Sequence, residues 1–282
     1  MNQFQSVYGV DFSGAKLAGR NIWIARCEPR ARGRLALVEL DQLEKLAGTA
    51  DREPALAHLV TLIRSSRDAL WAIDAPFGMP IEILPRGCTW PQQLQIIARW
   101  KDEAYAFGLW CLERAKKLGG AIHIRRATDV EAKTPFDCYH YRIIYQAFHG
   151  MRDVLLPLHR TPGTAIVPFD NGAIVKRASR VIVEACPSST LKRLSLPHQN
   201  YKQPAGGPLT AKRRRTRATV LAGLAPHVTI APTLRARIIR NPGGDALDAL
   251  IAAVGAARLW PTVDLRDVAR HQRYPREGFL YA

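Results

Sequence analysis

The chain has 282 residues, of which 47% are hydrophobic and 23% are charged, and its formal net charge at pH 7 is +17. This composition is typical of a folded protein with a large core, and the excess of positive charge favours polyanionic partners. The five cysteines lack a Cys-x-x-Cys spacing, which argues against a disulfide framework and a structural zinc site. No apolar run reaches the roughly 18 residues that span a bilayer, and the N-terminus lacks a signal-peptide pattern, so we expect a cytoplasmic protein without a membrane partner.

The first quarter of the chain predicts four strands and one helix. Residues 7–12 are apolar, and residues 21–28 and 34–40 alternate between polar and apolar, with short glycine-containing connections that favour antiparallel neighbours. Apolar residues recur at helical spacing over residues 51–66. The strand at residues 69–73 follows a helical crossover, so we expect it to be parallel to a member of the first set.

The middle and end of the chain predict a helical insertion and then a return to strands and helices. The insertion, at about 85–160, contains three predicted helices, over residues 90–100, 102–117 and 139–158. After it come predicted strands at 164–167, 173–176 and 180–184, a loop at 204–208, a basic helix at 210–224 and an alanine-rich helix at 245–259. We therefore predict a single α/β domain over residues 1–282, in which three antiparallel strands and further parallel strands form a mixed sheet flanked by helices.

Several carboxylates lie where buried strands should end or where a helix should begin. Asp11, Asp74 and Glu184 each close an apolar run, and Asp245 and Asp248 lie in the first turn of the alanine-rich helix. The carboxyl ends of adjacent parallel strands meet at one edge of a sheet, so Asp11 and Asp74 should lie together there. Clustered carboxylates repel one another and must protonate in part or bind cations. Oxygen-only ligands indicate Mg²⁺ or Mn²⁺, and two such ions can catalyse phosphodiester hydrolysis.

Each of these acids also has a structural alternative. Asp11 could bond backbone amides, and Asp74, before Ala-Pro, could form a turn. Asp245, after two glycines, could cap the helix, with Asp248 as the acid of a capping arrangement. For Glu184 the alternative is a buried ion pair with an arginine or lysine.

The stretch between Glu184 and Asp245 contains no acidic residue and many basic ones. Solvated helix faces usually mix charges of both signs, so this stretch predicts a phosphate-facing surface and a nucleic-acid partner, DNA or RNA. The basic helix carries the densest group of candidate nucleic-acid-binding residues: Lys212, Arg213, Arg214, Arg215 and Arg217. Lys16 is a further candidate outside this helix.

Four motifs, in this order, resemble the successive signatures of the domain-of-unknown-function 429 family: Gly-Val-Asp-Phe-Ser-Gly-Ala-Lys, Ile-Asp-Ala-Pro-Phe-Gly-Met-Pro, Val-Glu-Ala-Cys-Pro-Ser and Gly-Asp-Ala-Leu-Asp-Ala-Leu. The closing Arg-Glu-Gly-Phe-Leu is also similar to the end of that family. The resemblance implies a ribonuclease H-like fold and a nuclease activity. It further implies that Asp11, Asp74 and Asp248 are the core carboxylates, with Glu184 and Asp245 as accessory members.

The leading hypothesis is therefore a Mg²⁺- or Mn²⁺-dependent nuclease. One alternative is an ATP-dependent phosphotransferase of the actin-like and sugar kinase type, because Asp-Phe-Ser-Gly followed by Lys16 resembles the first phosphate loop of those proteins. The other is a non-catalytic nucleic-acid-binding protein, which would bind with a steep salt dependence and without turnover.

Overall fold

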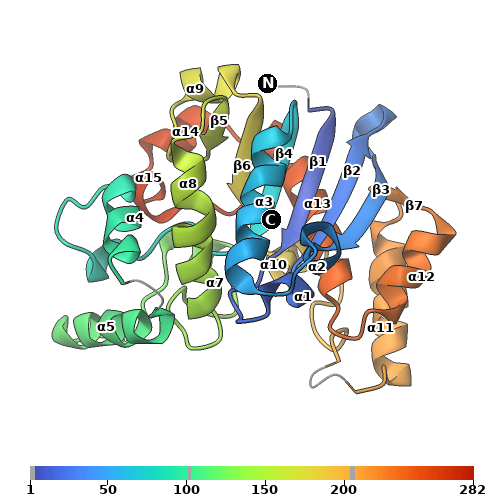
Figure 1. Ribbon diagram of the computed structural model, residues 1–282, viewed down its shortest axis with the longest axis horizontal. Coiled ribbons are helices and arrows are strands. Elements are labelled where there is room, and N and C mark those ends of the chain that lie inside the picture. Colours follow the sequence, from blue (N-terminus) through green and yellow to red (C-terminus); the bar gives the residue numbers. More distant parts are fainter. Residues whose placement is uncertain (1–3, 101–102, 204–206) are drawn as a thin grey trace.

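One mixed sheet of seven strands organises the protein, in a computed structural model that describes residues 4–100, 103–203 and 207–282 (Figure 1). The strands are β1 (Ser6–Asp11), β2 (Trp23–Pro29), β3 (Leu35–Gln42), β4 (Ala69–Asp74), β5 (Thr164–Ile166), β6 (Arg180–Glu184) and β7 (Val228–Ile230). Their order across the sheet is β5-β6-β4-β1-β2-β3-β7. The β1–β2 and β2–β3 pairs are antiparallel, and the other neighbours are parallel. The predicted α/β class, with antiparallel and parallel strands in one sheet, is confirmed.

Helices cover both faces of this sheet. Those before the insertion are α1 (Ala18–Asn21), α2 (Leu43–Ala47) and α3 (Arg52–Ser65), and those of the insertion are α4 (Trp90–Ala98), α5 (Ala104–Lys117), α6 (Ala127–Glu131), α7 (Ile144–His149), a π-helix (Gly150–Leu155) and α8 (Leu156–His159). The later ones are α9 (Gly172–Arg177), α10 (Pro187–Arg193), α11 (Ala211–Leu224), α12 (Pro232–Arg240), α13 (Asp245–Leu259), α14 (Leu265–Arg270) and α15 (Tyr274–Glu277). Short 3-10 turns lie at Ala31–Gly33, Ile81–Ile83 and Trp260–Thr262. Among the described residues no helix is both long enough and apolar enough to cross a membrane.

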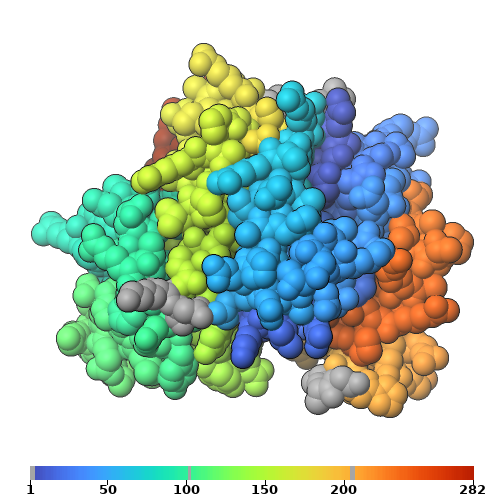
Figure 2. Space-filling model, viewed as in Figure 1, coloured from blue at the N-terminus to red at the C-terminus, as the bar shows by residue number. Residues whose placement is uncertain are grey.

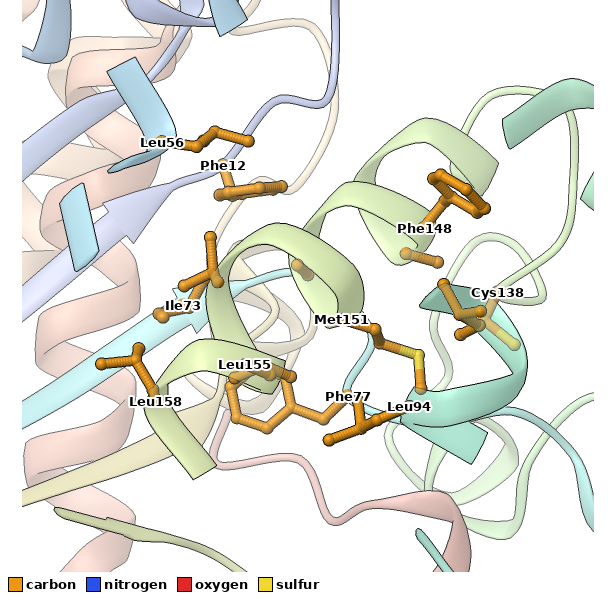
Figure 3. Packing of buried hydrophobic residues seen from close by; sticks show 14 of the residues in the cluster. Phe12, Leu56, Ile73, Phe77, Leu94, Cys138, Phe148, Met151, Leu155 and Leu158 are labelled. Atoms are coloured by element: carbon orange, nitrogen blue, oxygen red, sulfur yellow. The ribbon is translucent and has the colours of Figure 1, made fainter. Parts of the chain in front are cut away.

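The face of the sheet that carries α3 also carries the insertion. Phe12 and Ile73, at the ends of β1 and β4, pack there with Phe77, Phe148 and Met151 in one buried cluster (Figure 3). Figure 2 shows that α3 and the insertion helices cover the sheet on this side. The insertion therefore shares a core with the sheet and does not build a separate one.

The opposite face is covered by α13, which is buried on almost every side over residues 246–256. A helix that is apolar all round belongs in an interior, and α13 packs directly on β1, β2 and β4. The close contact depends on Gly9, because a Cβ atom at that position would lie 1.9 Å from the carbonyl oxygen of Ala249. This contact fixes the first turn of α13 beside the end of β1.

The strand predicted at residues 173–176 is wrong, because this segment is the helix α9. Asn171 caps it, since its side-chain oxygen accepts hydrogen bonds from the backbone N–H groups of Ala173 and Ile174. The periodicity of a four-residue apolar run does not distinguish a strand from a helix. Here the cap that Asn171 forms favours the helix.

Other sequence-based expectations differ from the structure in detail or fall outside the described residues. The helix expected at 139–158 begins only at Ile144 and passes through the π-helix into α8. Strand β7 and helix α12 were not predicted. Residue 102, where a helix was expected to begin, and residues 204–206 of the expected loop lie outside the described residues.

Candidate active site

Asp11 and Asp74 lie side by side at the carboxyl ends of β1 and β4. The two residues are partners in the parallel register, so their side chains leave the sheet on the same face, about 4.8 Å apart along the hydrogen-bonding direction. Their neighbours Val10 and Ile73 belong to the core beneath α3. Because side chains alternate along a strand, Asp11 and Asp74 point to the α13 face.

Asp248 approaches the same place from the first turn of α13. The helix begins at Asp245 after Gly244, whose φ of 89° occupies the left-handed region that favours glycine. Asp248 is 2% exposed and lies with Asp11 and Asp74 in the wall of one cavity. The structure thus brings together the three aspartates that the sequence grouped.

A lysine ammonium accompanies these aspartates. The Nζ atom of Lys202 forms an ion pair with Oδ2 of Asp248, and the hydroxyl of Tyr201 donates to Oδ1 of the same carboxylate at 2.8 Å. The Lys202 side chain is 48% exposed, whereas that of Asp248 is buried. The sequence placed Lys202 only within the acid-free basic stretch and did not indicate Tyr201, because a loop lysine and a loop tyrosine carry no periodic signal.

The electrostatics of the group show an excess of negative charge. Burial, reinforced by the charge of Asp248, raises the pKa of Asp74 to about 7. Burial also raises the pKa of Asp11 well above its usual range, against the opposing influence of Lys202. Burial disfavours the Lys202 ammonium, but Asp248 and Asp11 outweigh this effect and raise its pKa. The carboxylates therefore favour a cation beside them, and Lys202 supplies one.

The side chain of Glu184 points to the face of the sheet opposite to that of Asp11 and Asp74. It pairs in register with Ile73, one residue before Asp74, and so points toward the core beneath α3. Its two oxygens accept from the guanidinium of Arg126 at 2.5 and 2.9 Å, and the backbone N–H of Phe77 donates at 3.0 Å. The buried ion pair, which was the structural alternative for Glu184, is present. Glu184 and Arg126 also border the cavity that contains the three aspartates.

Arg126 joins Glu184 to the insertion and to the end of the chain. Its guanidinium also donates to both carboxylate oxygens of Asp129 at 2.9 Å and to the carbonyl oxygen of Glu277 at 2.9 Å. Glu277 in turn accepts from Arg273 and from two backbone N–H groups of the insertion and the segment before it. In the sequence, the signal that could have indicated this network is Arg126 followed three residues later by Asp129 at the start of a helix.

Asp245 is the first residue of α13 and not its cap, because Gly244 occupies the N-cap position. Its carboxylate is half-buried, and it interacts electrostatically with Lys202 and with the guanidinium of Arg217. Asp245 does not line the cavity that contains Asp11, Asp74 and Asp248.

The basic helix α11 does not present all of its cations to solvent. Lys212, Arg214 and Arg215 are exposed, and Arg213 lies at the cavity, where it donates to the side chain of Gln203 at 2.8 Å. Arg217 is fully buried and donates to the carbonyl oxygens of Tyr201 at 2.6 Å and Pro242 at 2.6 Å, among others. The assignment of Arg217 to a nucleic-acid surface is therefore wrong, since the amphipathic helix turns this position into the core.

Lys16 is exposed and lines a different cavity, of about 600 Å³, with Asp51, Arg52 and Asp153. It is therefore not assembled with Asp11, although the two residues are only five positions apart in the sequence.

The cavity that contains the three aspartates has a volume of about 770 Å³ and opens between two chain segments. One wall comes from the insertion, with Phe136 and Gln146, and the other from the segment after β6, with Lys192 and His198. The Nζ atom of Lys192 donates to the carbonyl oxygen of Lys133 at 2.5 Å and so links the two walls. The cavity is thus lined by both carboxylates and cations.

Carboxylate oxygens, such as those of Asp11, Asp74 and Asp248, are the type of ligand that a hard divalent cation such as Mg²⁺ or Mn²⁺ prefers. Within residues 4–100, 103–203 and 207–282, no three His, Cys, Asp or Glu side chains converge closely enough to hold an ion in the arrangement shown. The ammonium of Lys202 instead neutralises part of the negative charge of these carboxylates.

No protein-family model, curated protein or solved structure matches this chain.

Proposed function

We propose that the protein hydrolyses phosphodiester bonds of nucleic acid, DNA or RNA, at the edge of the sheet where β1 and β4 end. The observation that carries the proposal is the in-register pair Asp11 and Asp74, which lines one cavity together with Asp248 and with the cations Lys192 and Arg213. A buried group of acids is costly unless it handles a cation or a proton, and a cationic rim attracts a polyanion.

The arrangement of the sheet supports a ribonuclease H-like assignment. Three antiparallel strands continue into parallel strands through β1 and β4, and the paired acids lie at the carboxyl ends of those two strands. Ligands of open α/β sheets bind at this edge. Together with the sequence motifs, this topology leads us to propose membership of the domain-of-unknown-function 429 family.

In the proposed reaction Asp11, Asp74 and Asp248 would hold Mg²⁺ or Mn²⁺. Such an ion, when bound, supplies positive charge to a phosphoryl oxygen and lowers the pKa of a water molecule. The side chains of Lys192 and Arg213 bind the flanking phosphates, and the side chain of Gln203 orients Arg213. A water oxygen forms a bond to phosphorus, the ester P–O bond breaks, and the leaving oxygen takes up a proton, which yields a phosphomonoester and an alcohol.

Hydrolysis ranks above phosphotransfer because Lys16 lines another cavity and is not beside Asp11. The non-catalytic alternative draws support from the ion pair between Lys202 and Asp248, since a compensated site needs no metal. Hydrolysis and non-catalytic binding differ in whether cleavage occurs.

The test is Mn²⁺-dependent cleavage of a mixed panel of single-stranded and duplex DNA and RNA. We expect Asp11→Asn to lower cleavage at least about 100-fold, the scale seen when a group that stabilises a transition state is removed. Asp267→Asn, on the exposed surface of α14, is the matched control and should cleave as the wild type does. Equal cleavage by Asp11→Asn and the wild type would exclude the proposal, and absence of cleavage with retained binding would favour the non-catalytic alternative.

A further inference from the structure

Three aromatic rings and a guanidinium lie together in the insertion, next to the cavity that contains the three aspartates. We infer that this group stacks with unpaired bases, so that the protein binds single-stranded nucleic acid at the cavity. The inference rests on the proposed function, because it names the class of substrate for the same cavity. We call the group the aromatic platform, and its members are Phe136, His140, Tyr141 and Arg142.

The side chains of the aromatic platform contact one another. The ring centroids of Phe136 and His140 are 4.4 Å apart, and their planes differ by 23°. The centroids of His140 and Tyr141 are 4.5 Å apart. The guanidinium of Arg142 lies 5.6 Å from the ring centroids of both Phe136 and Tyr141, and its Nε donates to the Tyr141 hydroxyl at 3.0 Å. Aromatic rings combined with an arginine are the surface on which the bases of single strands stack.

The aromatic platform is open to solvent although its rings are large. Tyr141 is 65% exposed and Arg142 is exposed, whereas Phe136 and His140 are half-buried. Rings that served only to stabilise the loop would contribute more if they were buried in the core. A cluster of exposed aromatic side chains instead marks a binding surface.

The aromatic platform continues into the cavity of the three aspartates. Phe136 lines this cavity, and so do Ile143 and Gln146, which follow the platform in the chain. Lys192 lines the cavity from the other wall, and its Nζ atom donates to the carbonyl oxygen of Lys133, three residues before Phe136. A nucleic-acid strand can therefore place bases on the platform while one of its phosphodiesters lies in the cavity.

The charge of the segment that carries the platform suits a polyanion. Residues 132–145 include the exposed cations Lys133 and Arg142 and a single acid, Asp137. Asp137 is 3% exposed, and its Oδ2 atom lies 2.8 Å from Nδ1 of His123. The exposed charge of the segment is therefore positive, which favours phosphate groups as its partners.

The loop of the aromatic platform is fixed within the protein itself. The backbone N–H of Tyr139 donates to Oδ1 of Asp137 at 3.1 Å. The hydroxyl of Tyr139 donates to the carbonyl oxygen of Ile122 at 2.9 Å and accepts from the backbone N–H of Ile124 at 2.6 Å. These bonds tie the loop to the segment before α6. A surface that is already ordered loses less entropy when it binds a ligand.

Bases that stack on the platform must be unpaired. In a duplex the faces of each base are covered by its neighbours, whereas the bases of a single strand can be splayed out onto aromatic side chains. Stacking uses the faces of the bases and not their edges, so we expect little sequence preference. DNA and RNA share this chemistry.

The experiment measures binding to the full-length chain by fluorescence anisotropy in EDTA, so that cleavage does not disturb it. The probes are labelled oligothymidylate, oligouridylate, a DNA duplex and an abasic strand with the same number of phosphates as the oligothymidylate. We expect the wild type to bind at least one of the base-containing single strands about tenfold more tightly than the abasic strand, because stacked bases contribute affinity beyond that of the phosphates. The oligothymidylate and oligouridylate show whether DNA, RNA or both fit the platform.

Tyr141→Ala should weaken binding to the preferred single strand about tenfold, the scale of one lost base stack, and should leave binding to the abasic strand and the duplex unchanged. Tyr141→Phe keeps the ring and should bind as the wild type does. Tyr105→Ala is the matched control, because Tyr105 is a tyrosine of α5 with a similar exposure of 58%, and it should leave every affinity unchanged. If Tyr141→Ala does not fold, the wild-type comparison with the abasic strand still decides.

Equal wild-type affinity for the base-containing and abasic strands would overturn the inference, and so would a Tyr141→Ala variant that weakens all probes alike or none. Self-association of the free protein that Tyr141→Ala abolishes would also overturn it, because a second copy would then cover the platform. These results would leave the proposed nuclease intact. Unchanged cleavage by Asp11→Asn would instead remove the nuclease and leave the platform as a binding surface for single strands.

Discussion

Two groups of carboxylates lie at the same edge of the sheet, on its opposite faces, and they differ in how their charge is balanced. On the insertion face Glu184, Asp129 and Glu277 are bound by arginine guanidinium groups and by backbone N–H donors. On the α13 face the ammonium of Lys202 is paired with Asp248 and also acts on Asp11.

The difference separates a structural cluster from a candidate site. A buried acid whose oxygens accept several directed hydrogen bonds holds chain segments together, as Glu184 does for the insertion and the sheet. Burial, reinforced by the charge of the neighbouring Asp248, raises the pKa of Asp74, so a cation beside this carboxylate would be favourable. Proximity to a strand end is common to both groups, so it does not by itself identify a site.

The largest expected effect comes from removing one carboxylate on each face and comparing stability. Glu184→Ala removes one of the two carboxylates that bind the buried Arg126 guanidinium and also leaves the N–H of Phe77 without its acceptor, and we expect a loss of about 3 kcal/mol in the free energy of unfolding. Asp11→Asn should change it by less than about 1 kcal/mol, because it removes repulsion as well as charge. Chemical denaturation measures both, with exposed Glu113→Ala as the control. Similar losses of stability in Glu184→Ala and Asp11→Asn would contradict the distinction between the two groups of carboxylates.

The next effect is stabilisation by metal. At about 100 times its Kd, Mn²⁺ should stabilise the wild type by about 2.7 kcal/mol, because it binds the folded chain and not the unfolded one. Glu184→Gln should retain most of this gain, and Asp11→Asn should lose it. Thermal melts with and without Mn²⁺ provide the measurement. If the stabilisation by Mn²⁺ depended on Glu184 and not on Asp11, the ion would bind on the insertion face of the sheet, and the prediction would be wrong.

The smallest effect concerns the arginines of α11, which show the same contrast between buried and exposed groups. Replacing exposed Arg214 by alanine should lower nucleic-acid affinity a few-fold and reduce the slope of log K against log salt by about 0.9 for each phosphate that is no longer neutralised. Arg217→Ala should instead destabilise the fold by about 1–3 kcal/mol, because it strands buried carbonyl oxygens. Fluorescence anisotropy over a salt series and denaturation separate the two. An unchanged salt slope for Arg214→Ala would remove α11 from the binding surface.

Much of the fold could be predicted from the sequence because its elements carry strong local signals. The strands β1, β4 and β6 are apolar runs that each end in a carboxylate, and α13 has a continuous apolar surface, so that the sequence marks the type of each of these elements. Short segments could not be predicted in this way, as α9 and β7 show, because three to six residues fit either period and their neighbours decide.

The candidate site, too, could be predicted from the sequence only where the local signals are strong. Asp11, Asp74 and Asp248 could be grouped from the sequence, since each follows or begins a well-marked element. The face on which Glu184 lies could not, because it depends on a register in which Ile73, and not Asp74, is its partner. A shift of one residue in that register would have moved Glu184 to the other face.

The sequence by itself therefore determined which residues carry charge and at which end of which element they lie, because hydrophobic periodicity and chain punctuation are local. Only the tertiary structure decided which charges meet. Asp248 meets Lys202 from a different segment of the chain, Glu184 meets Arg126 across the sheet edge, and Arg217 turns inward. Charge pairing depends on distances through space, and these distances follow from strand register and helix packing, which no short stretch of sequence specifies.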